Sequence, residues 1–149
     1  MDAIFERMSI RKYEDRPVED EKIEKILRAA MAAPSAVNQQ PWEFYVVKNR
    51  DMIVELSKAS PFAACAAHAP VVIVPILRKD TKYPQIAPYD LSNATENMLL
   101  EATTLGLGAV WLAIAPFEDR IDNVVTLLHT PSHTLPFALV PVGYPAEKR

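Results

Sequence analysis

The stretch from residue 34 to residue 47 reads PSAVNQQPWEFYVV and joins a polar loop to an apolar segment. Prolines bound the loop at Pro34 and Pro41, and four amide or hydroxyl side chains lie between them. Aromatic and β-branched residues dominate the following six positions, which predicts a strand over residues 42–47. Rigid ends and many neutral hydrogen-bonding groups favour a loop that binds a polar, flat ligand. Because proline, serine and asparagine also favour turns, a plain connector is the alternative.

Helical and strand patterns alternate on both sides of this loop. Residues 19–32 place their apolar side chains on one helical face, and Pro34 disfavours helix at the residue before it. Further helices are predicted over residues 3–8, 50–60, 91–105 and 117–128, and further strands over residues 71–77, 109–113 and 135–142. Pro75 interrupts the apolar run at 71–77, which predicts an edge strand or a bulge there. The alternation predicts one domain of the α+β (mixed α/β) class over residues 1–149, with helices flanking a sheet.

The predicted helix over residues 91–105 carries an unusually wide apolar stripe. Such width is typical of a buried central helix or of a helix at an interface between subunits. A chain this short has little other surface to cover the stripe, so we expect it to form part of a homodimer interface. The stripe comprises Leu91, Ala94, Met98, Leu99, Leu100, Ala102 and Leu105.

Composition narrows the classes of function. The chain has 149 residues and a formal net charge of −3, which suits one core and disfavours nucleic acid as a partner. Cys65 is the single cysteine, so neither an internal disulfide nor a cysteine-based zinc site is expected. The longest apolar run, residues 63–77, is shorter than the roughly 18 to 20 residues of a membrane-spanning helix, and the first residues do not resemble a signal peptide. We therefore expect a cytoplasmic protein without a membrane segment.

A second candidate site is the basic segment at residues 7–12, which reads RMSIRK. Its cationic and hydroxyl side chains are charge-assisted donors of the kind that bind a terminal phosphate. The chain has three glycines and neither common glycine-rich phosphate motif, so side chains would have to hold a phosphate. A solvated basic turn is the alternative that the spacing leaves open.

A third candidate is the stretch at residues 106–113, which reads GLGAVWLA. Gly108 can simply end the preceding helix, but small residues also let a backbone approach a planar ligand closely. No metal is expected, because Pro131 opposes a shared helical face for His129 and His133.

Taken together, these stretches resemble the nitroreductase family of FMN-dependent flavoproteins, in a short single-domain form. The family segments Arg-x-Ser-x-Arg/Lys, Pro-Ser-x-x-Asn-x-Gln-Pro-Trp, Gly-Leu-Gly-x-x-Trp and Val-Gly-Tyr-Pro-Ala-Glu match residues 7–11, 34–42, 106–111 and 142–147. The resemblance implies a three-layer sandwich whose central, mainly antiparallel sheet is flanked by helices. It also implies a homodimer in which both subunits contribute to each active site.

The resemblance further implies which residues hold FMN. The phosphate would be held by Arg7, Met8, Ser9 and Arg11, and family members commonly add a later basic residue, for which Lys148 and Arg149 are the candidates. The ring would be contacted by Pro34, Ser35, Ala36, Asn38, Gln40, Trp111, Leu112 and Ala113. No catalytic side chain is implied, because the reaction takes place at FMN N5 beside the backbone amides of Leu112 and Ala113. Family members usually have glycine where this chain has Ala113.

The implied activity is reduction of a nitroaromatic, a quinone or a related small acceptor by NADH or NADPH, with ping-pong kinetics. Two alternatives stay open. One is a flavin-binding module with little turnover, and the other is a specialised flavin dehydrogenase or dehalogenase with the same fold.

Overall fold

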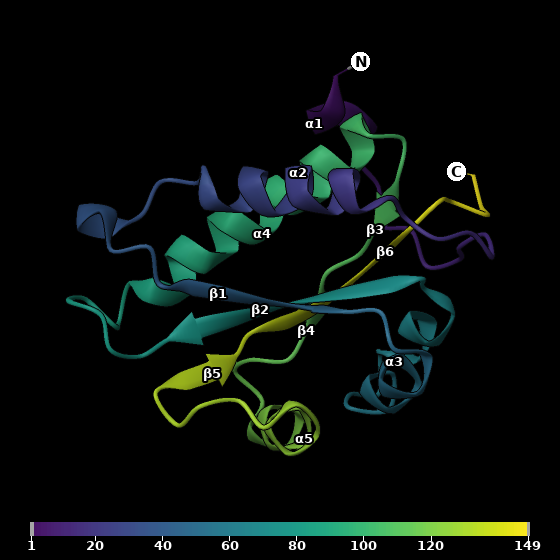
Figure 1. Cartoon of the computed structure of the whole chain (residues 1–149). Helices are drawn as coiled ribbons and strands as arrows, with labels where there is room; N and C mark the ends of the chain where they lie inside the picture. Colours follow the sequence, from purple (N-terminus) through teal and green to yellow (C-terminus); the bar gives the residue numbers. More distant parts are fainter. Residues whose placement is uncertain (1, 149) are drawn as a thin grey trace.

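An antiparallel sheet of six strands forms the middle layer of the computed structural model, which describes residues 2–148 (Figure 1). β2 is central: β1 pairs with one side of it, and β5 and β6 pair in succession with the other side. β3 and β4 pair with the far side of β6 and form an edge of the sheet. The predicted α+β class and antiparallel sheet are confirmed. The strands are β1 (Trp42–Val47), β2 (Val71–Arg78), β3 (Gly108–Ala109), β4 (Leu112–Ala113), β5 (Thr134–Pro136) and β6 (Ala138–Gly143).

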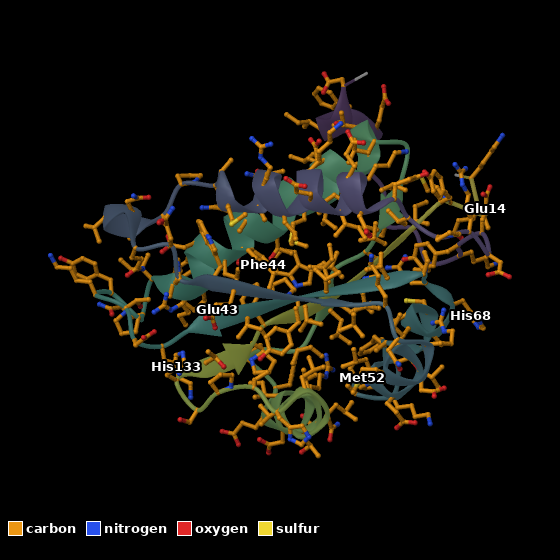
Figure 2. All side chains as sticks on the ribbon, in the orientation of Figure 1. Glu14, Glu43, Phe44, Met52, His68 and His133 are labelled. Carbon is orange, nitrogen blue, oxygen red and sulfur yellow. The ribbon has the colours of Figure 1, made fainter. Side chains whose placement is uncertain are left out.

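Helices cover both faces of the sheet. On one face lie α2 (Asp20–Met31) and α4 (Ala87–Thr104); on the other lie α3 (Arg50–Leu56), α5 (Glu118–Leu128) and the 3-10 helix η2 (Ala64–His68) (Figure 1). The short α1 (Ala3–Glu6) packs against α4 near the C-terminal end of that helix. Figure 2 shows Phe44 on the side of the sheet that faces α2 and α4, and Met52 of α3 on the other side. Among residues 2–148, no helix combines the length and apolar character needed to cross a membrane.

The apolar run of β2 reflects burial on both faces of the sheet. Val71 and Ile73 pack toward α2 and α4, whereas Val72 and Val74 pack toward α3 and α5. Of the two alternatives predicted at Pro75, the edge strand is wrong, because β2 has partners on both sides. The bulge is confirmed, because the partner strand has one residue more than β2 between the pairs Ile76–Pro136 and Ile73–Val140. Pro75 lies where β5 gives way to β6, and its carbonyl accepts a hydrogen bond of 2.9 Å from the Phe137 amide. At such a break between two ladders, the missing N–H of proline is tolerated.

The long helix α4 differs from its prediction in its start and in its role. It begins at Ala87, because Pro88 fits the first turn, where an N–H has no intrahelical acceptor. Leu91 and Met98 of the apolar stripe are fully buried in the core that α4 forms with α2 and the sheet. The chain itself covers most of this stripe, with Leu100 and Leu105 half-buried, so the stripe as a whole is not the subunit interface that we expected.

Two predicted strands are each divided in the structure. The strand expected over residues 109–113 is interrupted at Val110 and Trp111, and the strand expected over residues 135–142 is interrupted at Phe137. The division of the last strand lets β5 and β6 pair with different parts of β2. The division of the other strand leaves β4 as a separate two-residue edge beside β6.

Candidate functional site

The basic segment at residues 7–12 lies beside β3. Ser9 forms a parallel bridge with Ala109, and the Ile10 amide donates a hydrogen bond of 3.0 Å to the Ala109 carbonyl. Gly108 permits this approach, because a Cβ at that position would lie 2.6 Å from the Cβ of Ile10. The sequence left two explanations open for Gly108, the end of the preceding helix and close contact with a planar ligand. In the structure, Gly108 has no side chain, and the side chain of Ile10 occupies the space beside it.

The segment at residues 144–147 fastens the basic segment in place. The Glu147 Oε1 atom accepts hydrogen bonds from the amides of Arg11, at 2.6 Å, and Lys12, at 3.3 Å. The Ala146 amide donates to the Lys12 carbonyl at 2.9 Å. Because Glu147 takes both amides, an anion bound here would rely on side chains. Sequence reasoning missed this role of Glu147, whose only signal is its place at the end of the VGYPAE segment.

The cations predicted to hold a phosphate differ in their surroundings. The Nε atom of Arg7 lies 3.5 Å from Oε1 of Glu96 on α4, and both side chains are partly exposed. Arg11 is exposed. Arg149 lies outside the described residues. A hollow of about 340 Å³ opens beside the basic segment. It is lined by Glu6, Met8, Ile10, Thr103, Gly106, Leu107, Pro145, Glu147 and Lys148.

The polar loop at residues 34–41 adopts a backbone that few side-chain-bearing residues favour. The φ angles of Val37, Asn38 and Gln40 are +48°, +54° and +49°, in the left-handed region. The Ser35 hydroxyl accepts a hydrogen bond of 3.0 Å from the Gln40 amide. Val37, Asn38 and Gln40 are exposed, so the side chains of Asn38 and Gln40 are available to a ligand. Pro34 is exposed beside them, and Ala36 begins the 3-10 helix η1 (Ala36–Asn38).

Gln39, which the sequence does not single out as a site residue, is turned toward the body of the protein. Its side-chain nitrogen donates 2.7 Å to Oδ2 of Asp90, a buried residue in the first turn of α4. The other oxygen of Asp90 accepts a hydrogen bond of 3.0 Å from the Ala36 amide. These contacts determine where the loop lies.

The loop and the basic segment lie at opposite ends of α4 (Figure 1). Asp90, at the start of the helix, holds the loop, whereas Thr103, near its end, lines the hollow beside the basic segment. At 1.5 Å per residue, these two positions are about 20 Å apart along the helix axis. Within one chain, the two parts of the predicted FMN site therefore do not meet.

The edge strand β4 offers one free backbone amide. The Ile114 amide donates 3.2 Å to the Phe137 carbonyl, so the neighbouring pair of Ala113 and Ala138 is a non-hydrogen-bonded pair of the ladder. The amide of Leu112 therefore points toward β6, and the amide of Ala113 points away from it. Of the two amides predicted to face a ligand, only that of Ala113 has the required direction.

Two side-chain contacts support this edge. The rings of Trp111 and Phe137 lie 5.6 Å apart at an angle of 49°, a tilted aromatic contact. The Nη1 atom of Arg120 donates a hydrogen bond of 3.1 Å to the Ala113 carbonyl.

From Ala109 to Ala113, the edge spans about 13 Å at the usual rise of a strand. An extended ligand with an anionic end near the basic segment would thus bring its other end to Ala113.

Two titratable side chains near this region remain neutral. Burial raises the pKa of Tyr13 far above its ordinary value, and its hydroxyl donates 2.5 Å to the Ile10 carbonyl. Burial also raises the pKa of the Cys65 thiol, which disfavours a reactive thiolate.

Across residues 2–148, no three histidine, cysteine, aspartate or glutamate side chains lie close enough together to bind a metal. His68 and His133 lie at opposite ends of the sheet (Figure 2).

The structure defines an α+β protein whose candidate site residues lie in two separate parts of the chain, and comparison with known proteins identifies its family. A model described as the nitroreductase family matches residues 4–64 and 61–144. The chain therefore belongs to the nitroreductase family, which confirms the prediction from its sequence segments.

Three relatives illustrate the similarity. A protein of Methanothermobacter thermautotrophicus, assigned as an NADH dehydrogenase/NAD(P)H nitroreductase, is 46% identical over 148 residues, which cover 99% of this chain and 78% of the relative. A solved structure from Clostridium acetobutylicum, assigned as an NADH oxidase, has a TM-score of 0.97 at 46% identity. The match covers 99% of this chain and 90% of the Clostridium chain. A structure from Desulfovibrio desulfuricans, assigned as a nitroreductase, was solved in complex with FMN. It has a TM-score of 0.85 at 34% identity, and the match covers 97% of this chain and 85% of the Desulfovibrio chain.

Proposed function

We propose that this chain is an FMN-dependent NAD(P)H oxidoreductase that reduces nitroaromatic, quinone or related small acceptors as a homodimer. The separation of the loop and the basic segment by α4 carries the proposal, because a complete site then needs the basic segment of one subunit and the loop of its partner. The assigned activities of the relatives support the reaction class. A single cysteine suits a reducing cytoplasm, where we place the enzyme.

The residues at the basic segment suit a phosphate. Arg11 is exposed and Lys148 lines the adjacent hollow, so two cations can approach one anion. Arg7 can join them by exchanging its exposed ion pair with Glu96, since such pairs contribute little. Glu6 and Glu147 line the same hollow, but Glu147 is bonded to the amides of Arg11 and Lys12, and the three cations outnumber the two carboxylates. The donor set therefore fits the terminal phosphate of FMN.

The residues at the sheet edge and in the loop suit the ring. The Ala113 amide is a fixed donor at the edge of β4, and Asn38 and Gln40 of the partner's loop add neutral hydrogen-bonding groups. FMN, when bound, accepts a hydride from NAD(P)H and passes electrons to the acceptor. The chain has no glycine fingerprint for a second nucleotide, so both substrates would use the same exposed face in turn, which predicts ping-pong kinetics.

Exposed apolar side chains at the two ends of α4 suit such a homodimer. Ile4 and Phe5 on α1, at the end that carries the basic segment, are 70% and 85% exposed. Val37 and Tyr89, at the end that carries the loop, are 62% and 72% exposed. A two-fold axis would bring the first pair of one subunit against the second pair of the other. We propose that these exposed side chains, and not the stripe of α4, form the subunit interface.

A stepwise spectral experiment tests the proposed function. We expect the purified protein to carry FMN, identified by mass spectrometry of the released ligand. Added NADH or NADPH should bleach the visible absorbance without any acceptor, and a later addition of a quinone should restore it, because the two substrates act in turn. Release of FAD, or absence of flavin after reconstitution, would disprove FMN binding. Bound FMN that neither nucleotide bleaches would favour the module with little turnover.

Replacing Arg11 tests the phosphate contact. We expect Arg11→Ala to weaken FMN binding by about 1.5 to 3 kcal/mol, the usual contribution of a charge-assisted hydrogen bond. Riboflavin, which lacks the phosphate, should bind the variant and the wild type equally. Fluorescence titration of the apoprotein measures both ligands. Lys58→Ala is a matched control, because Lys58 pairs with Glu55 on the exposed surface beyond the end of α3. An unchanged dissociation constant for FMN in Arg11→Ala would identify the basic segment as a solvated turn.

A further inference from the structure

We propose that Asp90 and Gln39 are positioning residues that hold the loop at residues 34–41 where it can contact the flavin of the partner subunit. The identity of the ligand rests on the proposed function, whereas the attachment of the loop is visible in this chain alone. Neither residue is among those expected to touch the flavin, and each acts through the loop.

The loop needs an attachment because its own backbone is strained. Val37, Asn38 and Gln40 all adopt positive φ angles, and none of them is glycine. Asparagine tolerates this region, but a β-branched valine does so rarely. Such conformations persist when the surrounding structure imposes them. The two internal hydrogen bonds from the amides of Asn38 and Gln40 to Ser35 shape the turn but do not tie it to the rest of the protein.

Asp90 ties the loop to α4 through both of its carboxylate oxygens. Oδ1 accepts from the Ala36 amide at 3.0 Å, and Oδ2 accepts from Nε2 of Gln39 at 2.7 Å. The residue is only 4% exposed, and within residues 2–148 its carboxylate forms no ion pair. Its place in the first turn of α4, at the positive end of the helix dipole, supports the buried charge. Hydrogen bonds to an ionised acceptor are the strong ones, so this contact can hold a strained loop.

Gln39 ties the same loop to the segment that leads into α4. Its side-chain oxygen accepts from the Tyr83 amide at 2.9 Å, and its nitrogen donates to the Tyr83 carbonyl at 3.2 Å. The amide group of Gln39 thus pairs with the backbone of Tyr83 as a neighbouring strand would. Every side-chain hydrogen bond found between the described loop residues and another element involves Gln39 or Asp90. A backbone hydrogen bond of 2.9 Å from the Arg78 amide to the Pro41 carbonyl holds the end of the loop. Removing the contacts of Gln39 and Asp90 would therefore release the exposed residues between Pro34 and Pro41.

The substitution Asp90→Asn tests the attachment. Asparagine has nearly the same shape, but with its oxygen on the Ala36 amide its Nδ2 group would face Nε2 of Gln39, and two donors cannot bond. In the full-length apoprotein, we expect hydrogen exchange at the amides of residues 36–40 to accelerate by about tenfold or more, since a hydrogen bond to a charged group is lost. Exchange in β2 should stay unchanged. Ser92→Ala is the matched control, because the Ser92 hydroxyl bonds within the same helix to the Pro88 carbonyl.

Flavin titration then tests the positioning role. If the loop contacts the ring, Asp90→Asn should weaken FMN and riboflavin by the same factor, about tenfold or more. Arg11→Ala should instead weaken FMN alone. The double variant Gln39→Glu with Asp90→Asn exchanges the donor and the acceptor, so the introduced asparagine can donate to the introduced glutamate and accept from the Ala36 amide. We expect this exchange to restore part of the loss, reduced by the new contact between the introduced carboxylate and the Tyr83 carbonyl.

The outcomes separate this inference from the proposed function. Unchanged exchange at residues 36–40 in Asp90→Asn would overturn the attachment, whether or not flavin binds. Faster exchange in the loop with unchanged riboflavin affinity would overturn the positioning role. Faster exchange in β2 as well would show a general loss of stability and would also overturn it. A wild-type chain that binds no flavin would disprove the proposed function, while the exchange measurement would still decide whether Asp90 holds the loop.

Discussion

Coexpression of two defective variants is expected to restore about a quarter of the FMN capacity of the wild type. The first variant, Arg11→Glu, reverses a charge at the basic segment, and the second replaces Ser35, Asn38 and Gln40 by alanine. Each homodimer should bind little FMN, because each of its sites has one defective part. In a mixed dimer, one site receives both defects and the other receives none. Random pairing makes about half of the dimers mixed, so about one site in four is intact.

The stoichiometry of bound FMN after gel filtration measures this recovery. Differently tagged chains allow the mixed dimer to be isolated, where the expected value rises to about one FMN per two chains. Coexpression of each variant with a differently tagged copy of itself is the control and should restore nothing. If a single chain contained the whole site, the mixed dimer would also bind no FMN, since each chain would keep its own defect.

Replacing Gly108 by alanine should both destabilise the protein and weaken FMN binding. The added Cβ would lie 2.6 Å from two atoms of Ile10 and 2.7 Å from a third, so the basic segment must move away from β3. Overpacking of this kind costs about 1 to 3 kcal/mol, because the buried Ile10 side chain has little room to adjust. Urea unfolding measures the stability, and fluorescence titration measures the affinity for FMN.

Gly106 provides a matched control in the same segment. A Cβ there would meet no atom within 4 Å, but the φ angle of +76° disfavours any side chain. Gly106→Ala should therefore cost about 1 kcal/mol through backbone strain. Gly106 lines the hollow beside the basic segment, but its added Cβ would touch no atom of that segment, so this variant should weaken FMN binding less than Gly108→Ala does. Equal losses of affinity in the two variants would show that contact between Gly108 and Ile10 does not position the basic segment.

Local patterns in the sequence predict most of the layers of this fold. The spacing of Ile23, Ile26 and Ala30 identifies the buried face of α2, because helical periodicity is a property of neighbouring residues. The unbroken apolar run of β2 likewise indicates a strand covered on both faces. The sequence segments also indicate the family, since their order and spacing are specific.

Contacts between distant residues limit what the sequence reveals about the site. Asp90 has the appearance of an ordinary acidic residue at the start of a helix, and only the tertiary structure shows its bonds to Ala36 and Gln39. The stripe of α4 suggests a subunit interface by its width, but width does not reveal which surface covers it. The structure shows that α2 and the sheet do so. The direction of the Ala113 amide depends in the same way on the register of β4 against β6.

The bond between Glu147 and the Arg11 amide joins residues 136 positions apart in the chain. Synthesis proceeds from the N-terminus, so the basic segment is made well before Glu147 emerges. Contacts of such long sequence separation also form slowly, because a large loop has to close first. The basic segment thus reaches its final geometry late, because a nascent chain without Glu147 lacks the bond that holds this segment.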